Sequence, residues 1–244
     1  MTGADPAVVW HDVECGSYRA DLPLWRTLAG QRGDPILDVG AGTGRVTLEL
    51  ARAGWAVTAL DSDARLLAEL ERRAAGLPVT TAVADARRFA LDRRFALIVV
   101  PMQTIQLLGG AQGRAAFLGC ARSHLGPGGL VAVTLTEEFD LYQPQPGQPP
   151  LVADVLRING TIYSSRPVAV RPQGEGIVLE RRREISSAGH SQRVVAAEDT
   201  VHMDALSGDQ LEAEAQACGL RVAGRAAVPL TDLHVGSAVV MLDG

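Results

Sequence analysis

The chain has 244 residues, a length that suits one domain or one domain with a sizeable insertion. Apolar residues make up 47% and charged residues 21%, and the formal net charge of −5 argues against a broad nucleic-acid-binding surface, which is normally basic. No apolar stretch approaches the roughly 18 residues that span a bilayer. The first residues do not resemble a secretory signal, and the three distant cysteines lack metal-ligand spacing. We therefore expect a cytoplasmic protein with reduced thiols, no membrane span and no bound metal.

Short apolar runs alternate with segments of helical spacing in the first half of the chain. We expect strands at 36–40, 56–61, 79–85, 95–101 and 130–135, and helices at 43–53, 63–75 and 111–125. Alternation of this kind indicates βαβ units, and strands that are apolar almost throughout indicate a parallel sheet covered on both faces. The stretch "GPGG" (126–129) is expected to separate the last of these helices from its strand.

The pattern changes after Leu135. A proline-rich connector (142–150) cannot be regular structure, and the β-branched, arginine-rich region behind it predicts two or three antiparallel strands near 160–170, 176–186 and 192–203. Asn159-Gly160 is a candidate tight turn. Beyond this region we expect a helix over 207–219, with Ser207 as N-cap and Gly219 at its end, and a last strand pair at 220–228 and 237–243.

A glycine-rich loop follows the first strand in "ILDVGAGTGR" (36–45). In an open α/β sheet, ligands bind at this end of the strands. A P-loop needs a lysine that is absent here, and a dinucleotide loop needs glycine where Arg45 stands. The third candidate is a loop for S-adenosylmethionine, in which an acid, here Asp38, comes two residues before the first glycine. A glycine-rich turn alone does not identify its ligand. The residues at the ends of the later strands are needed to distinguish these candidates.

Two further acids follow later strands of the expected sheet. Asp61 ends the second strand, where a carboxylate accepts hydrogen bonds from both hydroxyls of a ribose. Asp85 ends the third strand, where a carboxylate takes an exocyclic adenine amine while the backbone N–H of Ala86 meets a ring nitrogen. One such acid is more often a strand-end cap, but three at successive strand ends favour a cofactor site.

In order and spacing, "ILDVGAGTGR", "VTALDSD", "AVADARRF", "FALIVVPMQTIQLL" and "LGPGGLVAVTL" resemble the motifs of class I S-adenosylmethionine-dependent methyltransferases. The resemblance covers about 36–135 and the terminal helix and strand pair. It implies a Rossmann-like, doubly wound α/β fold with a seven-stranded sheet of order 3-2-1-4-5-7-6, the last strand antiparallel. It places Gly40, Ala41, Gly42 and Gly44 at the methionine part of the cofactor, Asp61 and Ser62 at the ribose, Asp85 and Ala86 at the adenine, and Pro101, Met102 and Gln103 at the sulfonium.

The fourth-strand motif departs from two branches of this family. It reads "VPMQ" rather than the "NPPY" of amino and base methyltransferases, and it lacks the strand-four aspartate of metal-dependent catechol enzymes. Both departures favour a metal-free enzyme that acts on another kind of acceptor.

The resemblance also implies roles for the regions outside the expected core. We divide the chain into an N-terminal lid segment (1–30), a core (31–139 and 204–244) and an inserted antiparallel substrate cover (140–203). In the lid, Tyr18 would meet the methionine carboxylate, with Arg19 a weaker candidate, and His11 and Glu14 would contact the acceptor. The alternative is a short helix that only packs on the sheet, through Leu22, Leu24, Trp25 and Leu28. "ERRRE" (180–184) is expected to be a solvated strand face rather than a nucleic-acid patch, with Arg182 pointing away from Arg181 and Arg183.

The expected reaction is transfer of a methyl group from S-adenosylmethionine to the nitrogen or oxygen of a small polar metabolite. No catalytic residue is assigned. An amine acceptor would need only to be in its neutral form, with help from a nearby carboxylate such as Glu137, Glu138 or Asp140, whereas a hydroxyl would use a base from among His11, His190, His202 and His234. An RNA or protein methyltransferase on the same fold, a nicotinamide oxidoreductase, and a non-catalytic cofactor-binding or scaffold protein stay as alternatives. We expect no nucleic-acid or membrane partner, and a homodimer stays open.

Overall fold

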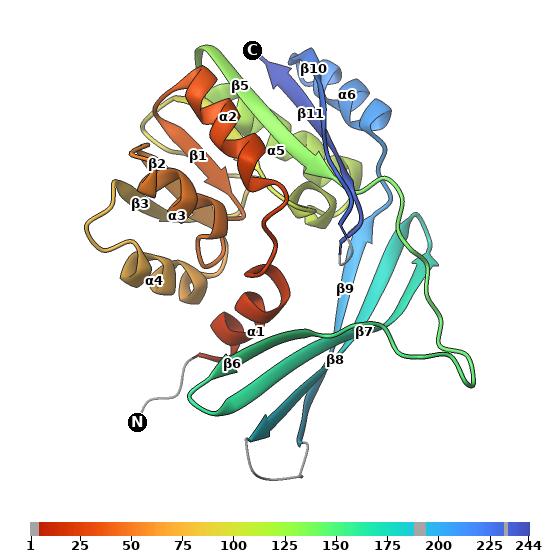
Figure 1. Cartoon of the computed structure of the whole chain (residues 1–244). Helices are drawn as coiled ribbons and strands as arrows, with labels where there is room; N and C mark the ends of the chain where they lie inside the picture. The colour runs from red at the N-terminus through yellow and green to blue at the C-terminus, as the bar shows by residue number, and fades with distance from the viewer. Residues whose placement is uncertain (1–4, 188–193, 232–233) are drawn as a thin grey trace. The chain divides into compact units, whose positions relative to one another are not determined.

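The computed structural model describes residues 5–187, 194–231 and 234–244, and it divides the chain into two compact units. The core unit comprises Arg19–Glu137 and Leu206–Gly244, and the sheet unit comprises Met1–Tyr18 and Glu138–Ala205 (Figure 1). The expected lid segment is thus divided, because helix α1 (Pro6–Cys15) belongs to the sheet unit and helix α2 (Leu22–Arg32) to the core unit. Among the described residues, no helix is long and apolar enough to cross a membrane.

A seven-stranded sheet forms the centre of the core unit. Its order is β3-β2-β1-β4-β5-β11-β10, and β11 runs antiparallel to both of its neighbours while β1 to β5 pair in parallel. Counted along the core, this is the expected order 3-2-1-4-5-7-6, so the fold prediction is confirmed. The strands are β1 (Ile36–Val39), β2 (Val57–Asp61), β3 (Val79–Val83), β4 (Phe95–Val100), β5 (Leu125–Leu135), β10 (Arg221–Val228) and β11 (Ser237–Asp243).

Helices cover both faces of this sheet, which is why its central strands are apolar on both sides. On one face, Leu60 joins a buried cluster with α5 (Gly110–His124) and α6 (Gly208–Ala217), and the short 3₁₀ helix η1 (Thr104–Leu107) packs there too. Its neighbour Ala59 points to the other face and packs against α3 (Arg45–Arg52) and α4 (Ala64–Arg73). Helix α2 contacts α3 and β4 on that second face.

Two boundary predictions in the core unit have different outcomes. Helix α6 begins as expected, with a capping box in which the Ser207 side chain accepts from the Gln210 backbone, and Gly219 beyond its end has φ of +80°. The expectation that "GPGG" separates helix from strand is wrong, because β5 starts at Leu125, directly after α5. The four residues instead form an irregularity in the pairing with β4, where a Cβ on Gly129 would lie only 2.8 Å from the Phe95 carbonyl oxygen.

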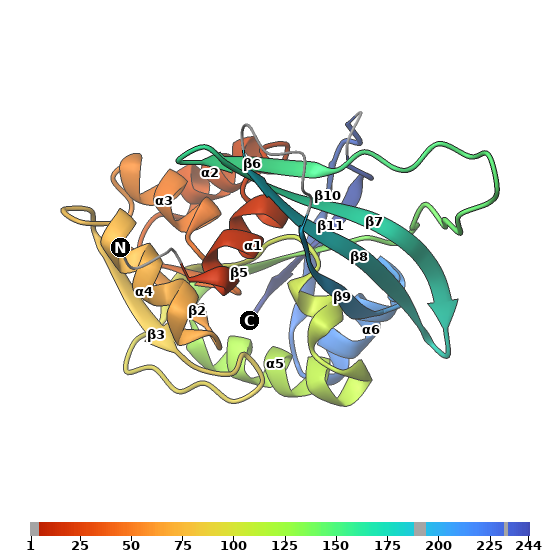
Figure 2. The same ribbon diagram turned by 90° about the horizontal axis from the view of Figure 1, so that it is seen from below.

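The sheet unit contains a four-stranded antiparallel sheet of order β6-β7-β8-β9 (Figure 2). Its strands are β6 (Asp154–Ile158), β7 (Thr161–Gln173), β8 (Gly176–Ser187) and β9 (Val194–Asp204). Three of them match the expectation and β6 was missed. Asn159 and Gly160, with φ of +48° and +80°, form the predicted turn between β6 and β7. Helix α1 packs on this sheet through Val9, Trp10 and Val13.

Candidate functional site

The glycine loop lies between β1 and α3, and its glycines have backbone geometry that other residues rarely adopt. Gly40, Gly42 and Gly44 have φ of +72°, +54° and +95°. A Cβ on Gly40 would also lie 2.7 Å from Oγ1 and Cγ2 of Thr104, the first residue of η1. The loop is therefore packed tightly against the segment that follows β4.

Asp61, at the end of β2, closes this loop. Its Oδ2 accepts a hydrogen bond of 2.8 Å from the backbone N–H of Gly42, and its Oδ1 accepts one of 2.9 Å from the N–H of Asp63. Two backbone donors thus fix the orientation of the carboxylate while each oxygen keeps a further lone pair. The N–H groups of Gly40 and Ala41 both donate to the carbonyl of Leu60, at 2.8 and 3.1 Å, so the loop is fastened to β2 along its first half.

Asp38 lies in β1, two residues before the first glycine of the loop, and is 1% exposed. Thr47 Oγ1 donates a hydrogen bond of 2.6 Å to its Oδ2, whereas its Oδ1 has no hydrogen-bond partner in the described part of the chain. Burial raises the pKa of Asp38 to about 6, against the lowering effect of the Thr47 hydrogen bond and the Arg45 charge. A buried carboxylate with one unsatisfied oxygen is costly, and it is ready to accept a donor.

Asp85 lies two residues beyond β3 and is linked to β2 through its neighbour Ala84, whose N–H donates to the Asp61 carbonyl at 2.9 Å. The backbone and side chain of Arg87 both bond the Asp85 carboxylate, with Nε at 2.9 Å from Oδ1 and Nη2 at 2.8 Å from Oδ2. These bonds lower the pKa of Asp85 to about 2. Asp85 therefore stays ionised, but a ligand amine would have to share it with Arg87. Ala86 and Ser62 are half-buried and exposed, respectively.

The segment after β4 carries a second unusual backbone conformation. Met102 has φ of +54°, which is uncommon for a residue other than glycine and is often found at functional sites. Thr104 Oγ1 donates to the Pro101 carbonyl at 2.9 Å, and Gln103 Nε2 donates to Thr136 Oγ1 at 3.0 Å. The side chains of this segment are thus held in place by η1 and by the residue that follows β5.

The sequence of this region matches one family. The profile described as "Methyltransferase domain" matches residues 36–129, which hold the glycine loop, Asp61, Asp85 and the segment after β4. Residues 36–129 are thus similar in sequence to methyltransferase domains.

Two curated methyltransferases are similar to part of this chain. A cypemycin N-terminal methyltransferase from Streptomyces sp is 30% identical over 111 residues, which are 46% of this chain and 45% of that protein. A ubiquinone biosynthesis O-methyltransferase from Paramagnetospirillum magneticum is 33% identical over 100 residues, covering 40% of this chain and 39% of that protein. The chain thus spans less than half the length of the curated relatives it matches.

Solved structures extend the likeness in fold to the whole chain. The S-adenosylmethionine-bound structure of CalS10, an amino pentose methyltransferase from Micromonospora echinaspora involved in calicheamicin biosynthesis, has a TM-score of 0.70 and 20% identity over 99% of both chains. At this identity the likeness shows the fold alone.

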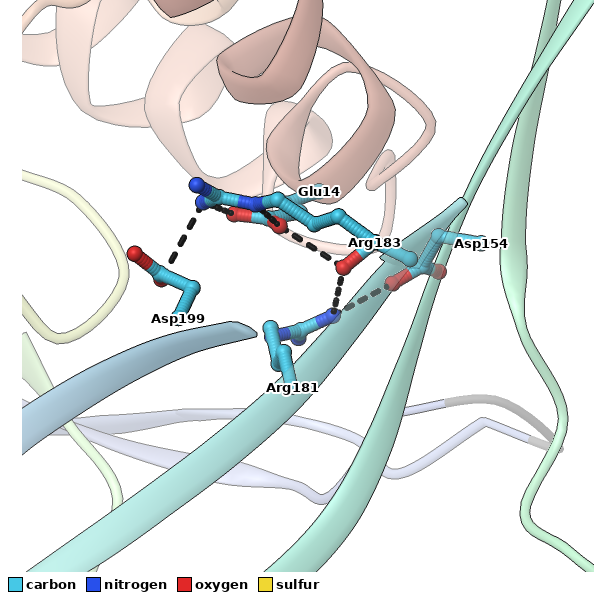
Figure 3. Close-up of polar contacts among 6 residues, drawn as sticks. Glu14, Asp154, Arg181, Arg183 and Asp199 are labelled. Carbon is cyan, nitrogen blue, oxygen red and sulfur yellow. Dashed lines mark hydrogen bonds and ion pairs between the residues drawn. The ribbon is translucent and has the colours of Figure 1, made fainter. Parts of the chain in front are cut away.

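Outside the matched residues 36–129, Glu14 takes part in a polar cluster of the sheet unit (Figure 3). Arg183 of β8 donates to both oxygens of Glu14, at 2.8 and 2.9 Å, and lies 3.1 Å from Asp199 of β9. Ser165 Oγ donates to Glu14 at 2.7 Å. Burial alone would raise the pKa of Glu14, but these hydrogen bonds hold it below its usual range. Glu14 is therefore a firmly ionised partner of Arg183, which makes it a poor proton acceptor.

The other residues predicted to contact the methyl acceptor or the cofactor differ in their burial and in their hydrogen-bond partners. Glu137 accepts a hydrogen bond of 2.6 Å from the backbone N–H of Gly208, the first residue of α6, so it stabilises the start of that helix. His11 is half-buried with Nδ1 4.0 Å from Asp12, and Tyr18 is a buried residue of the sheet unit. His202 is exposed on β9, the His234 N–H bonds Thr231, and His190 lies outside the described residues. Roles for these side chains in binding or catalysis stay predictions.

The stretch 180–184 differs from its expectation. Arg181 and Arg183 do share one face, but the prediction that they are solvated is wrong, since their side chains are only 15% and 17% exposed. Arg181 pairs with Asp154 at 3.0 Å, and the guanidinium of Arg183 lies 5.4 Å from the centre of the Trp10 ring. Arg182, on the opposite face, is 47% exposed as expected. Helix α1, which the sequence analysis did not recognise, packs on the face with Arg183.

Three residues at the site were missed because their roles depend on tertiary contacts. Thr47, Thr104 and Asp21 contact Asp38, the glycine loop and Arg45, respectively. The sequence contained a weak indication for Thr47, because a polar residue on the apolar face of a short helix needs a hydrogen-bond partner when it is buried. Asp5, the N-cap of α1, followed by Pro6 was a readable start signal for that helix.

Proposed function

We propose that this protein transfers a methyl group from S-adenosylmethionine to the nitrogen or oxygen of a small polar metabolite. The observation that carries the proposal is the Asp61 carboxylate, which Gly42 and Asp63 hold in a fixed orientation beside the glycine loop. A carboxylate so placed at the end of the second strand is suited to bind both hydroxyls of a ribose. The matched methyltransferase domain and the fold support the same cofactor.

The residues around the loop fit the chemical groups of this cofactor. The unpartnered Oδ1 of Asp38 would be satisfied by an ammonium group near the loop, as the methionine end of the cofactor would provide. In the proposed site Gly40, Ala41, Gly42 and Gly44 adjoin the methionine end, Asp61 and Ser62 the ribose, Asp85 and Ala86 the adenine, and Pro101, Met102 and Gln103 the sulfonium. Tyr18 stays a candidate for the methionine carboxylate.

When bound, S-adenosylmethionine supplies a methyl group on a sulfonium, which is already an activated leaving group. The task left to the chain is to hold an acceptor lone pair about 3 Å from that methyl carbon and in line with the sulfur. Gln103, whose amide is held by Thr136, and the strained backbone at Met102 give the segment after β4 a defined shape for this purpose. An amine acceptor needs only to be neutral, whereas a hydroxyl also needs a base.

A small acceptor is supported by CalS10, which is an amino pentose methyltransferase. The two curated relatives, an N-terminal methyltransferase and an O-methyltransferase, support nitrogen or oxygen as the acceptor atom. The net charge of −5 and the ion-paired arginines of β8 disfavour RNA as the substrate. A cytoplasmic location and a homodimer are further proposals, and sedimentation of the purified protein tests the second.

Calorimetric titration with S-adenosylhomocysteine tests the cofactor. We expect binding by the wild type and a loss of roughly 1.5–3 kcal/mol in Asp61→Ala, as for charge-assisted hydrogen bonds. Asp63→Asn is the matched control. Asp63 is the neighbouring acid that caps α4, and the asparagine side chain in the variant can still accept the capping hydrogen bond. Equal affinities of Asp61→Ala and wild type would refute the ribose assignment. Formation of S-adenosylhomocysteine with panels of amino sugars, amines and hydroxylated metabolites tests the activity.

A further inference from the structure

Arg45, the residue after the glycine loop, forms a buried ion pair with the start of α2. Its Nη2 lies 2.7 Å from Asp21 Oδ2, its Nη1 donates to Oδ1, and the Trp25 indole N–H donates to the same carboxylate at 2.8 Å. The side chains of Arg45 and Asp21 are 7% and 0% exposed. A bidentate pair fixes both distance and orientation, so the first residue of α3 is held rigidly against α2.

The position of this pair connects it to the glycine loop. Gly44, which precedes Arg45, is also confined from the α4 side, because a Cβ there would lie 2.2 Å from Leu70. Helix α3 has no side-chain cap at its beginning, so the loop end depends on contacts from neighbouring helices. The loop is therefore held at Gly42 by Asp61 and just beyond its end, at Arg45, by Asp21.

The Arg45–Asp21 ion pair also affects the ionisation of Asp38. Thr47, Arg45 and Asp61 are the groups that act on Asp38: the first two favour its ionised form, and the Asp61 charge disfavours it. Asp21 neutralises Arg45 and so limits how strongly Arg45 can favour the Asp38 carboxylate. Arg45 thus contributes a rigid contact and a charge, and these two contributions can be separated by mutation.

We propose that Asp21 and Arg45 are positioning residues for the cofactor, which fix the end of the glycine loop and balance the charge of Asp38 beneath it. This inference rests on the proposed function, because it requires that the loop and Asp38 bind the methionine end of S-adenosylmethionine. Neither residue contacts that ligand in the proposed site. They act through the loop and through Asp38.

A second ion pair between the same two helices provides the control. Arg26 of α2 pairs with Glu49 of α3 at 2.9 Å, but its side chain is 52% exposed. Arg26→Gln therefore removes a contact between α2 and α3 without changing the buried pair or the loop. Exposed pairs contribute little, so this variant should bind S-adenosylhomocysteine as the wild type does.

The experiment measures S-adenosylhomocysteine affinity from pH 5 to pH 9 in the wild type and in Arg45→Gln, Arg45→Lys, Asp21→Asn and Arg26→Gln. Arg45→Gln removes a positive charge near Asp38, so the pH midpoint of tight binding should rise by roughly one pH unit. Asp21→Asn leaves Arg45 uncompensated, so the midpoint should fall. Arg45→Lys keeps the charge but not the bidentate contact, so affinity should fall roughly tenfold at an unchanged midpoint.

The outcomes distinguish the two proposals. Opposite shifts in Arg45→Gln and Asp21→Asn support the inference, because damage to packing alone would weaken binding equally at every pH. Wild-type affinity and midpoint in all of these variants would overturn it. If Asp21→Asn does not fold, the contrast between Arg45→Gln and Arg45→Lys decides, and equal midpoints in that pair overturn the charge role. If the wild type itself binds no S-adenosylhomocysteine, the proposed function fails first.

Discussion

The backbone N–H of Gly42 donates a hydrogen bond to Asp61 Oδ2, so the loop after the first strand is closed by a side chain at the end of the second. The two residues are 19 positions apart. Closure at this point orients a carboxylate before any ligand arrives, which lowers the cost of ordering the site when a ligand binds.

Gly40→Ala should abolish binding of S-adenosylhomocysteine while leaving most of the fold intact. The added Cβ would meet Thr104 at 2.7 Å, and φ of +72° is unfavourable for alanine. Gly54→Ala is the matched control, because Gly54 also has positive φ, at +98°, but a Cβ there would have no neighbour within 4 Å. Calorimetry measures the affinity of both variants for S-adenosylhomocysteine. Equal affinities would show that the contact between residue 40 and Thr104 is not needed for binding.

Asp38 should make the stability of the ligand-free protein depend on pH. Its folded pKa of about 6 is higher than the ordinary value of 3.8, so between these values the folded state binds more protons than the unfolded state. Stability from this group is therefore present below pH 4 and is lost as the pH rises to 6, by roughly 3 kcal/mol in total. Urea unfolding of Asp38→Asn should lack this decline, and an unchanged slope in the variant would contradict the assignment.

Arg183→Met should destabilise the sheet unit by roughly 2–4 kcal/mol, because it leaves the Glu14 carboxylate largely buried without its main partner. Arg182→Met on the opposite face is the control, since Arg182 is 47% exposed and lies 3.7 Å from Glu198. Hydrogen exchange of the α1 amides and chemical unfolding measure the difference. Similar stability of the two variants would argue against a structural role for Arg183.

Glu137→Ala should lower the free energy of unfolding by about 1 kcal/mol, since Glu137 bonds the first N–H of α6. Affinity for S-adenosylhomocysteine should not change. Glu138→Ala, the adjacent exposed acid, should have almost no effect on stability. A large loss of methyl transfer in Glu137→Ala with unchanged stability would instead favour the alternative role of Glu137 beside the acceptor.

The sequence was sufficient for the sheet of the core unit because its central strands are short apolar runs, and β1 and β2 end in recognisable motifs. Gly40, Gly42 and Gly44 and the later Asp61 identified the loop and its closing acid for the same local reason. Strand β6 was missed because it is an edge strand of 5 residues directly behind the proline-rich connector. Edge strands carry less of the apolar pattern on which such predictions depend.

Side-chain partners were harder to predict than elements. Arg45 was informative in the sequence only because a dinucleotide loop would have glycine there, and nothing near it in the chain indicated Asp21. The pattern "ERRRE" gave the correct alternation of faces but not the burial of Arg181 and Arg183, since burial depends on α1, which begins far away in the sequence. Contacts between distant segments leave no periodic signal.

The contact between Glu14 and Arg183 spans 169 positions of the chain. During synthesis α1 emerges before these strands, with Val9, Trp10 and Val13 on its apolar side, and the strands that cover these residues are made only after Arg19–Glu137 of the core unit. Until then the helix has no native surface on which to bury that side. Helix α1 is therefore made well before the strands on which its apolar side packs, and a chain that ended before β6 would leave that side without Leu156, Ile158 and Tyr163 to cover it.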